Sequence, residues 1–268
     1  MILETKKFVK PWGVDVLPAP FQGQQEGDQR IGEIWFDPRP PLEQLLVKYI
    51  FTSQALSVQV HPSDMQTLSN GLGRQGKEEC WLILDAKPGA KLGIGFVDKI
   101  STEEMRRAAQ EGSIETLMAW HAVSSGDFVY IPSNTVHAIG AGISLIEVQQ
   151  NSDITYRLYD YGRPRELHLE EGVAIAAGVP HDGRLRRRIP DDGYHVLVDG
   201  PLFHLDRLDG EINEDARARY SGSLLVIPQN GPANVSGEVV AAGQCAVADN
   251  INLLALESGS KVLIAQPA

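Results

Sequence analysis

Cysteine is nearly absent from this chain of 268 residues, which contains only Cys80 and Cys245. Two cysteines so far apart in sequence form neither a disulfide framework nor a Cys-x-x-Cys metal pair, so a small disulfide-stapled fold is excluded. Long apolar runs are also lacking, since no stretch approaches the roughly 18 residues that a membrane span needs. The opening residues MILETKKFVKPWG lack the apolar region of a secretory signal. We therefore expect a cytoplasmic protein without a membrane partner.

Positive charge is scarce as well. The chain carries 24 Lys and Arg residues against 35 Asp and Glu residues, which gives a net charge of −11. A general nucleic-acid binder has a basic excess, so nucleic acid is excluded as a partner. The densest basic run, GRLRRRI at 183–189, lies between two prolines without interleaved aromatic residues, which indicates a solvated linker. An anionic ligand must therefore meet a local cluster of cations.

Short runs of alternating polarity, separated by glycine and proline, fill most of the chain. Runs such as LSVQVH, CWLILD, DFVYIP and ISLIEVQQ predict strands, and their number favours a mainly β sandwich or barrel. Two helices interrupt them. The first begins at Ser101, with Glu104 in a capping-box position, and ends at Gly112, and the second covers about 169–177. The proline, glycine and charge of 178–193 indicate a boundary between a domain at 1–180 and a smaller β-domain at 190–268.

The stretch LSVQVHPSD, residues 56–64, places polar side chains on one face of a predicted strand. Gln59 and His61 alternate with two valines, so they point to the opposite face from the valines. Glu79 lies at the entrance of another predicted strand, and His137 opens a further one. One amide oxygen, two imidazoles and one carboxylate together form a plausible set of ligands for a divalent transition metal.

Three longer motifs surround these residues: SVQVHPSD, GKEECW and IPSNTVHAIGAGISLIEVQQNSDITYRLYDYGR. Over roughly residues 10–178 the sequence resembles the type I mannose-6-phosphate isomerases, which are zinc-dependent cupins. The resemblance implies a cupin (jelly-roll) barrel with a few helices, followed beyond about 190 by a second, smaller, degenerate cupin-like β-domain. It also implies one zinc ion per chain, with Gln59, His61, Glu79 and His137 as its ligands.

The same resemblance implies roles for further residues. Arg157 and Lys77 match the family's active-site arginine and lysine, and Ser57 and Arg163 fall where the family places phosphate or substrate contacts. Glu147 matches an acidic residue proposed for proton transfer. Because an arginine side chain stays protonated, Arg157 holds developing negative charge rather than acting as a base. The base remains open between Glu147 and a water molecule at the metal.

These residues predict an aldose–ketose isomerase that interconverts mannose 6-phosphate and fructose 6-phosphate by metal-assisted proton transfer. Its partner is a small hexose 6-phosphate, and its oligomeric state is open. One alternative is a non-haem metal-dependent cupin oxygenase, because two histidines and a carboxylate also form a facial triad. Another is a sugar-phosphate-binding cupin without catalysis. Lys77 and Arg157, as cations suited to a sugar phosphate, favour the isomerase.

Overall fold

The computed structural model describes residues 1–24, 27 and 29–268, and it is mainly β, as the sequence predicts. One antiparallel sheet has seven strands in the order β1-β2-β3-β10-β5-β8-β12. Their bounds are β1 (Thr5–Val14), β2 (Ile31–Phe36), β3 (Leu45–Phe51), β10 (Ile143–Gln150), β5 (Glu79–Ala86), β8 (Asp127–Ile131) and β12 (Arg186–Arg188).

A second antiparallel sheet faces the first and has the order β11-β4-β9-β6-β7. Its strands are β11 (Tyr156–Tyr159), β4 (Val58–Val60), β9 (His137–Ile139), β6 (Lys91–Phe96) and β7 (Met118–Ala122). Side chains from both sheets, among them Trp81, Ile94 and Leu145, pack into one buried cluster between them. The arrangement is cupin-like, but the two sheets remain open and do not close into a continuous barrel.

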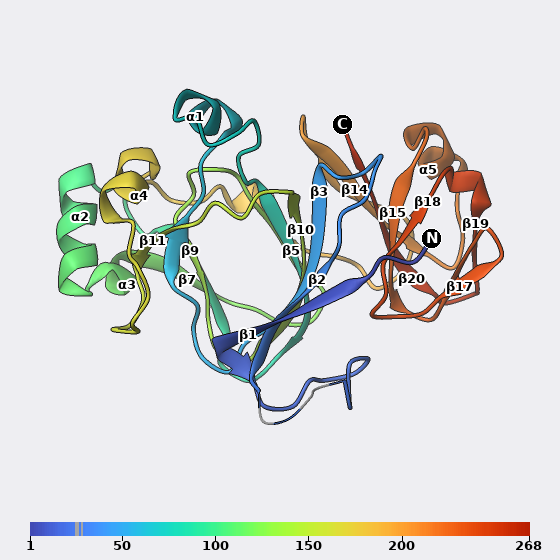
Figure 1. Ribbon diagram of the computed structural model, residues 1–268, viewed down its shortest axis with the longest axis horizontal. Coiled ribbons are helices and arrows are strands. Elements are labelled where there is room, and N and C mark those ends of the chain that lie inside the picture. The colour runs from blue at the N-terminus through green and yellow to red at the C-terminus, as the bar shows by residue number, and fades with distance from the viewer. Residues whose placement is uncertain (25–26, 28) are drawn as a thin grey trace.

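Helices cover the outer face of the second sheet (Figure 1). These are α2 (Thr102–Glu111), α3 (Ile114–Leu117) and α4 (Leu169–Ile175), whose apolar side chains pack against Val58, Val60 and Leu158. Helix α2 begins as predicted, with the Ser101 hydroxyl accepting a hydrogen bond from the Glu104 amide, and ends at Gly112 in the left-handed conformation. Helix α4 is two residues shorter than expected. Helix α1 (Asp64–Ser69) follows β4.

The remaining strands form two further sheets, which lie beside the seven-stranded sheet (Figure 1). A five-stranded sheet has the order β13-β14-β20-β15-β18, and a three-stranded sheet has the order β17-β16-β19. Their bounds are β13 (His195–Asp199), β14 (Phe203–Asp209), β15 (Leu224–Asn230), β16 (Ala233–Val235), β17 (Glu238–Val240), β18 (Ala246–Ala248), β19 (Leu254–Leu256) and β20 (Lys261–Pro267), with helix α5 (Glu214–Arg219) between β14 and β15.

The segment expected to be a linker, 178–193, contains regular structure. Strand β12 pairs with β8, with Arg186 opposite Val129, and becomes the last strand of the seven-stranded sheet. The prediction of a linker was wrong for this run, because backbone pairing does not require apolar side chains at a sheet edge. The predicted solvated face is confirmed, since Arg187 and Arg188 are exposed. The division into domains at 1–180 and 190–268 stays a prediction.

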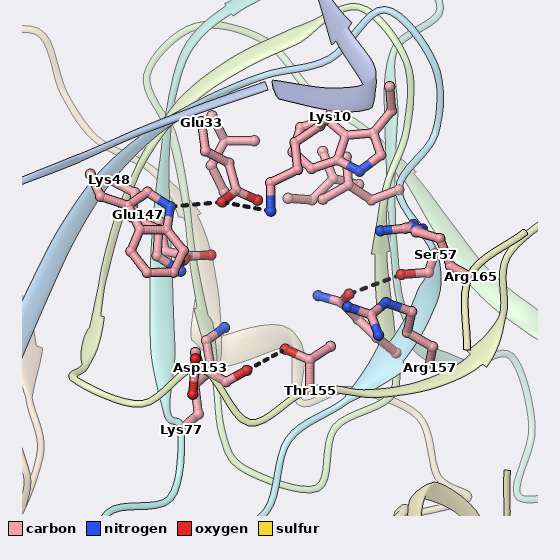
Figure 2. Close-up of a pocket in the computed structure, with 16 residues that line it drawn as sticks. Lys10, Glu33, Lys48, Ser57, Lys77, Glu147, Asp153, Thr155, Arg157 and Arg165 are labelled. Atoms are coloured by element: carbon pink, nitrogen blue, oxygen red, sulfur yellow. Dashed lines mark hydrogen bonds and ion pairs between the residues drawn. The ribbon is translucent and has the colours of Figure 1, made fainter. Parts of the chain in front are cut away.

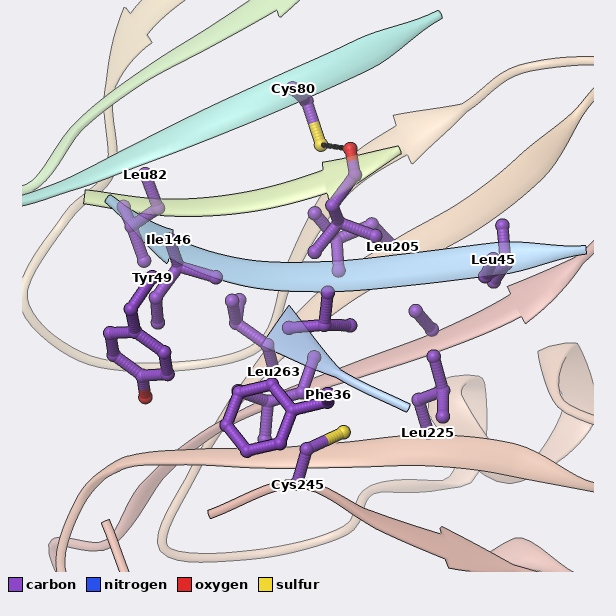
Figure 3. Close-up of a cluster of buried hydrophobic side chains, with 14 of the residues drawn as sticks. Phe36, Leu45, Tyr49, Cys80, Leu82, Ile146, Leu205, Leu225, Cys245 and Leu263 are labelled. Carbon is purple, nitrogen blue, oxygen red and sulfur yellow. Dashed lines mark hydrogen bonds between the residues drawn. The ribbon is translucent and has the colours of Figure 1, made fainter. Parts of the chain in front are cut away.

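One apolar core joins the two parts of the molecule (Figure 3). It contains Leu82 and Ile146 from the seven-stranded sheet together with Leu205 and Leu263 from the C-terminal sheet, all buried. The N-terminal residues contribute to the same junction, because the Leu3 amide donates to the Cys245 carbonyl at 2.8 Å. Within the described residues, each helix is too short or too polar to cross a bilayer.

Because the core is shared, truncation of Leu205 should destabilise the whole chain. We expect Leu205→Ala to lower the free energy of unfolding by about 2–5 kcal/mol, the usual cost of a buried leucine, in one cooperative transition. Urea unfolding followed by tryptophan fluorescence and circular dichroism measures both quantities. Leu253→Ala, at a leucine that is 43% exposed, is the matched control and should change stability by less than about 1 kcal/mol. Two separate transitions in the parent would contradict a common core.

Candidate metal centre and active site

Pairing between neighbouring strands brings the predicted ligands together. Strand β4 places Gln59 directly opposite His137 of β9, and His61 follows at the end of β4. Glu79 opens β5 in the facing sheet. The ligand atoms of His61, Glu79 and His137 all lie within 4.8 Å of one another, and the three side chains are buried. The two valines of β4 face the helices, so strand alternation produces the separation that the sequence predicts.

Backbone carbonyls orient both imidazoles toward the same point. Nδ1 of His61 lies 2.9 Å from the Ile154 carbonyl, and Nδ1 of His137 lies 2.9 Å from the Thr135 carbonyl. Each carbonyl accepts the Nδ1 proton, so each Nε2 is unprotonated and its lone pair lies on the side of Glu79. Burial lowers the pKa of His137 to about 3 and that of His61 well below its usual range. Both rings are therefore neutral at pH 7, as metal ligands must be.

The carboxylate of Glu79 has the chemistry that a cation needs. Its Oε1 is buried without a hydrogen-bond partner among the described residues and lies 3.3 Å from Nε2 of His137. Its Oε2 accepts a hydrogen bond from the ammonium of Lys77, which also lies 3.0 Å from Nε2 of His61. Burial raises the pKa of Glu79 to about 7, and the neighbouring Glu147 adds to the rise. A positive charge at this point is what keeps Glu79 ionised.

Gln59 lies beside the group formed by His61, Glu79 and His137. Its Nε2 lies 3.3 Å from Nε2 of His137, and its Oε1 accepts a hydrogen bond from the Ser57 hydroxyl at 3.1 Å. A half-turn of the amide would bring the oxygen to face the imidazole and carboxylate ligands. Two imidazoles, one carboxylate and one amide oxygen suit a four-coordinate zinc ion, so the residues present fit the metal that the sequence predicts.

A row of polar side chains crosses the facing sheet. The register places Trp35 opposite Lys48, Lys48 opposite Glu147 and Glu147 opposite Trp81. Glu147 forms an ion pair with Lys48 at 3.0 Å and accepts a hydrogen bond from the Trp81 indole at 3.0 Å. Although burial opposes ionisation, these donors and Lys77 lower the pKa of Glu147 to about 2. Glu147 is therefore ionised at neutral pH and weakly basic.

A cavity of about 230 Å³ lies between the two facing sheets and is lined by side chains from both of them. Figure 2 shows Ser57, Arg157 and Arg165 on one side of it, with Lys48 and Glu147 across from them. Gln59 and Lys77, which both contact the metal-ligand group, line the cavity too. Five basic and three acidic residues border it: Lys10, Lys48, Lys77, Arg157 and Arg165 against Glu33, Glu147 and Asp153. The cavity is thus locally basic within an acidic chain.

Two arginines, Arg157 and Arg165, line the cavity beside Ser57. The side chain of Arg157 has no hydrogen-bond or ion-pair partner within the described part of the chain. Burial, followed by the charge of Arg165, lowers the pKa of Arg157 from its usual value. Like charges held together beside the Ser57 hydroxyl form a natural receptor for an anion.

The structure does not bring every predicted residue to the cavity. Arg163 lies outside its lining, with its guanidinium bound to Asp160 and to the Ala55 carbonyl. Arg165, two residues later, lines the cavity, and sequence reasoning missed it. It also missed Lys48, although a lysine in the middle of the apolar run LLVKYIF was a usable signal. Such a charge in a buried strand needs a partner, and Glu147 is that partner.

The fold and the site define a cupin-like protein with a His/Glu/His group able to hold a metal ion. No protein-family model matches the chain. The chain is 44% identical over 137 residues to mannose-6-phosphate isomerase ManA of Bacillus subtilis (strain 168), and 42% identical over 137 residues to mannose-6-phosphate isomerase of Streptococcus mutans serotype c. Each match covers 49% of this chain and 43% of the relative. The chain spans about half the length of the curated relatives it matches.

Solved structures agree with these matches along nearly the whole chain. The crystal structure of mannose 6-phosphate isomerase from Bacillus subtilis superposes with a TM-score of 0.79 at 24% identity, covering 99% of this chain and 98% of that one. A structure described as mannose 6-phosphate isomerase (holo; zinc bound) gives a TM-score of 0.74 at 14% identity, covering 99% and 98%. The predicted resemblance to mannose-6-phosphate isomerases is confirmed, and the cupin-like fold with it.

The geometry predicts one metal ion per chain. After loading with zinc and removal of the excess, we expect the parent to hold about one zinc ion, and His61→Ala or His137→Ala to lose most of it, because each removes one of the converging Nε2 atoms. Elemental analysis measures the stoichiometry. His195→Ala, at a histidine bonded to the Asp192 carbonyl far along the chain, is the control and should retain the metal. Full zinc content in either His61→Ala or His137→Ala would refute the assignment.

Proposed function

We propose that this chain is a zinc-dependent isomerase that interconverts mannose 6-phosphate and fructose 6-phosphate. The observation that carries the proposal is a buried His/Glu/His group opening through Gln59 and Lys77 into a cavity bordered by five basic residues. The relatives' printed names support the same reaction. Zinc at Gln59, His61, Glu79 and His137 would supply Lewis-acid polarisation of the oxygens on C1 and C2, the two carbons between which the proton moves.

Different residues of the chain are suited to the two ends of the substrate. Arg165 and the Ser57 hydroxyl are suited to the phosphate, because a guanidinium binds phosphate through two parallel hydrogen bonds. Arg157, directly opposite Gln59 in the strand register, is suited to the negative charge that develops on the sugar oxygens as the enediolate forms. Arg163 is paired with Asp160 here, so it could contact the phosphate only after leaving that carboxylate.

Proton transfer between C1 and C2 needs a base near those carbons. Glu147 remains our candidate, since it borders the cavity and is ionised at neutral pH. Its pKa of about 2 makes it a weak base while Lys48 and Trp81 hold it. Lys48 therefore sets the basicity of this carboxylate, and loss of the Lys48 charge should raise the pKa of Glu147 toward the usual carboxyl value.

The two alternatives are less well supported by the site. A non-haem oxygenase would use the same two imidazoles and carboxylate, but the basic lining of the cavity fits a sugar phosphate. Gln59 also lies beside His137, where an oxygenase would leave coordination positions of its metal open. Oxygen uptake by the metal-loaded protein, measured beside a coupled isomerase assay, separates the two. A binding protein without catalysis would bind hexose 6-phosphate and show no turnover.

We also propose that 1–180 forms the metal-binding domain and that 190–268 contributes stability rather than ligands. In support, the described residues that border the cavity lie between Lys10 and Arg165, and the metal-ligand group lies within the same range. The C-terminal sheet contributes instead to the shared apolar core. A crystal structure with a C-terminal side chain bound to the metal would overturn this division.

The substitution most diagnostic of the reaction is Arg157→Lys. It keeps the positive charge and removes the planar fork, so we expect turnover of mannose 6-phosphate to fall by at least ~10²-fold, the scale of losing one preorganised oxyanion donor. Zinc content should be unchanged. A coupled assay for fructose 6-phosphate measures turnover, and Arg217→Lys, at an exposed arginine bonded to Asn252, is the matched control. Near-normal turnover in Arg157→Lys would remove this residue from the mechanism.

A further inference from the structure

The loop after β11 holds a buried carboxylate that binds two arginines at once. Asp160 is only 2% exposed. Its Oδ2 accepts from Nε of Arg165 at 2.6 Å and its Oδ1 accepts from Nη2 of Arg165 at 2.7 Å, which is a two-pronged pair. Oδ1 also accepts from Nη1 of Arg163 at 3.1 Å. One negative charge thus serves two guanidinium groups, and the cluster keeps a net positive charge.

The backbone of this loop turns sharply enough to bring both arginines to one carboxylate. Tyr161 and Gly162 have φ values of 55° and 72°, and the Arg163 amide donates to the Asp160 carbonyl at 3.0 Å. A tyrosine in the left-handed region is unfavourable by itself, so the surrounding contacts must maintain it. The Asp160 side chain supplies three of those contacts.

Arg163 ties the loop to the segment that precedes Ser57. Its Nη2 donates to the Ala55 carbonyl at 2.8 Å and to Oε1 of Gln54 at 3.1 Å. The two arginines bound to Asp160 therefore have different structural roles. Arg163 fastens the loop to residues 54–55, whereas Arg165 reaches the cavity beside Ser57 and Arg157, as Figure 2 shows for the last three.

We propose that Asp160 is a positioning residue that fixes the Arg165 guanidinium to receive the phosphate end of the substrate. The proposal rests on the proposed function for the identity of that substrate. With Nε and Nη2 committed to Asp160, the fork cannot rotate, and the other edge of the guanidinium stays available to an anion. A preorganised donor loses little freedom on binding, so its benefit appears as affinity for the phosphate group.

The test is Asp160→Asn, which keeps the size of the side chain and removes its charge. We expect the KM for mannose 6-phosphate to rise about tenfold or more, and competitive inhibition by inorganic phosphate to weaken by a similar factor, while kcat changes less than about threefold. Asp182→Asn is the matched control. Asp182 forms a similar two-pronged pair, with its Oδ1 accepting from Nε and its Oδ2 from Nη2 of Arg184, on an exposed segment that does not border the cavity. The KM and the inhibition by phosphate should therefore stay unchanged in that variant.

A folded Asp160→Asn protein with normal KM and normal phosphate inhibition would overturn the proposal, as would a fall in kcat alone. A double-mutant cycle with Arg165→Ala adds a check, because a residue that acts through Arg165 should add little once Arg165 is gone. Should Asp160→Asn fail to fold, Arg165→Lys leaves Asp160 bound to Arg163 and removes only the fork. Unchanged KM and phosphate inhibition in that variant would equally overturn the proposal.

Failure of the proposed function is distinguishable from failure of this inference. If the parent shows no isomerase activity toward mannose 6-phosphate, the proposed function fails. Calorimetric titration with inorganic phosphate alone then still compares the parent with Asp160→Asn. Weaker phosphate binding in the variant supports the role of Asp160, and equal binding refutes it.

Discussion

Burial of the Glu79 carboxylate is the constraint on which the rest of the site depends. A carboxylate removed from water loses its hydration and stays ionised only where cations or donors replace it. Here Lys77 supplies the cation, and two imidazoles converge on the same side chain. The apolar residues that surround this group exclude water from it. The polar interior is therefore stable only as a complete set, which explains why strands distant in sequence must meet in one register.

The same seven-stranded sheet satisfies this constraint a second time, at Glu147, with different residues. Lys48 and Glu147 neutralise each other directly across a strand pair, while the Trp35 ring lies 4.3 Å below the Lys48 ammonium. Glu79 with Lys77 and Glu147 with Lys48 are therefore two internally neutral pairs on one side of the cavity. The excess of positive charge is left to the arginines at the cavity border. Local charge dominates there because the net −11 of the chain is screened beyond about 8 Å at physiological ionic strength.

Strand alternation made the metal-ligand group readable from sequence, because Gln59 and His61 can share a face only if the intervening valine takes the other one. The same rule could not separate Arg163 from Arg165. Both lie after β11 in a loop with left-handed residues, where side chains no longer alternate. The resemblance implied Arg163, whereas Arg165 is the residue that lines the cavity. Strand β12 was missed for a related reason, since composition indicates solvent exposure and says little about backbone pairing at an edge.

The hydrogen bonds of residues 1–3 limit the order in which parts of the fold can form during synthesis. The Val247 amide donates to the Met1 carbonyl at 2.9 Å, and Ile2 forms a bridge with Ala246. These partners lie far apart in sequence, so residues 1–3 are synthesised long before the residues near 245 and can pair with them only afterwards. The metal-ligand strands, by contrast, are all translated by about residue 150. Vectorial synthesis therefore allows the metal-ligand group to assemble before the junction between residues 1–3 and residues 245–247 can form.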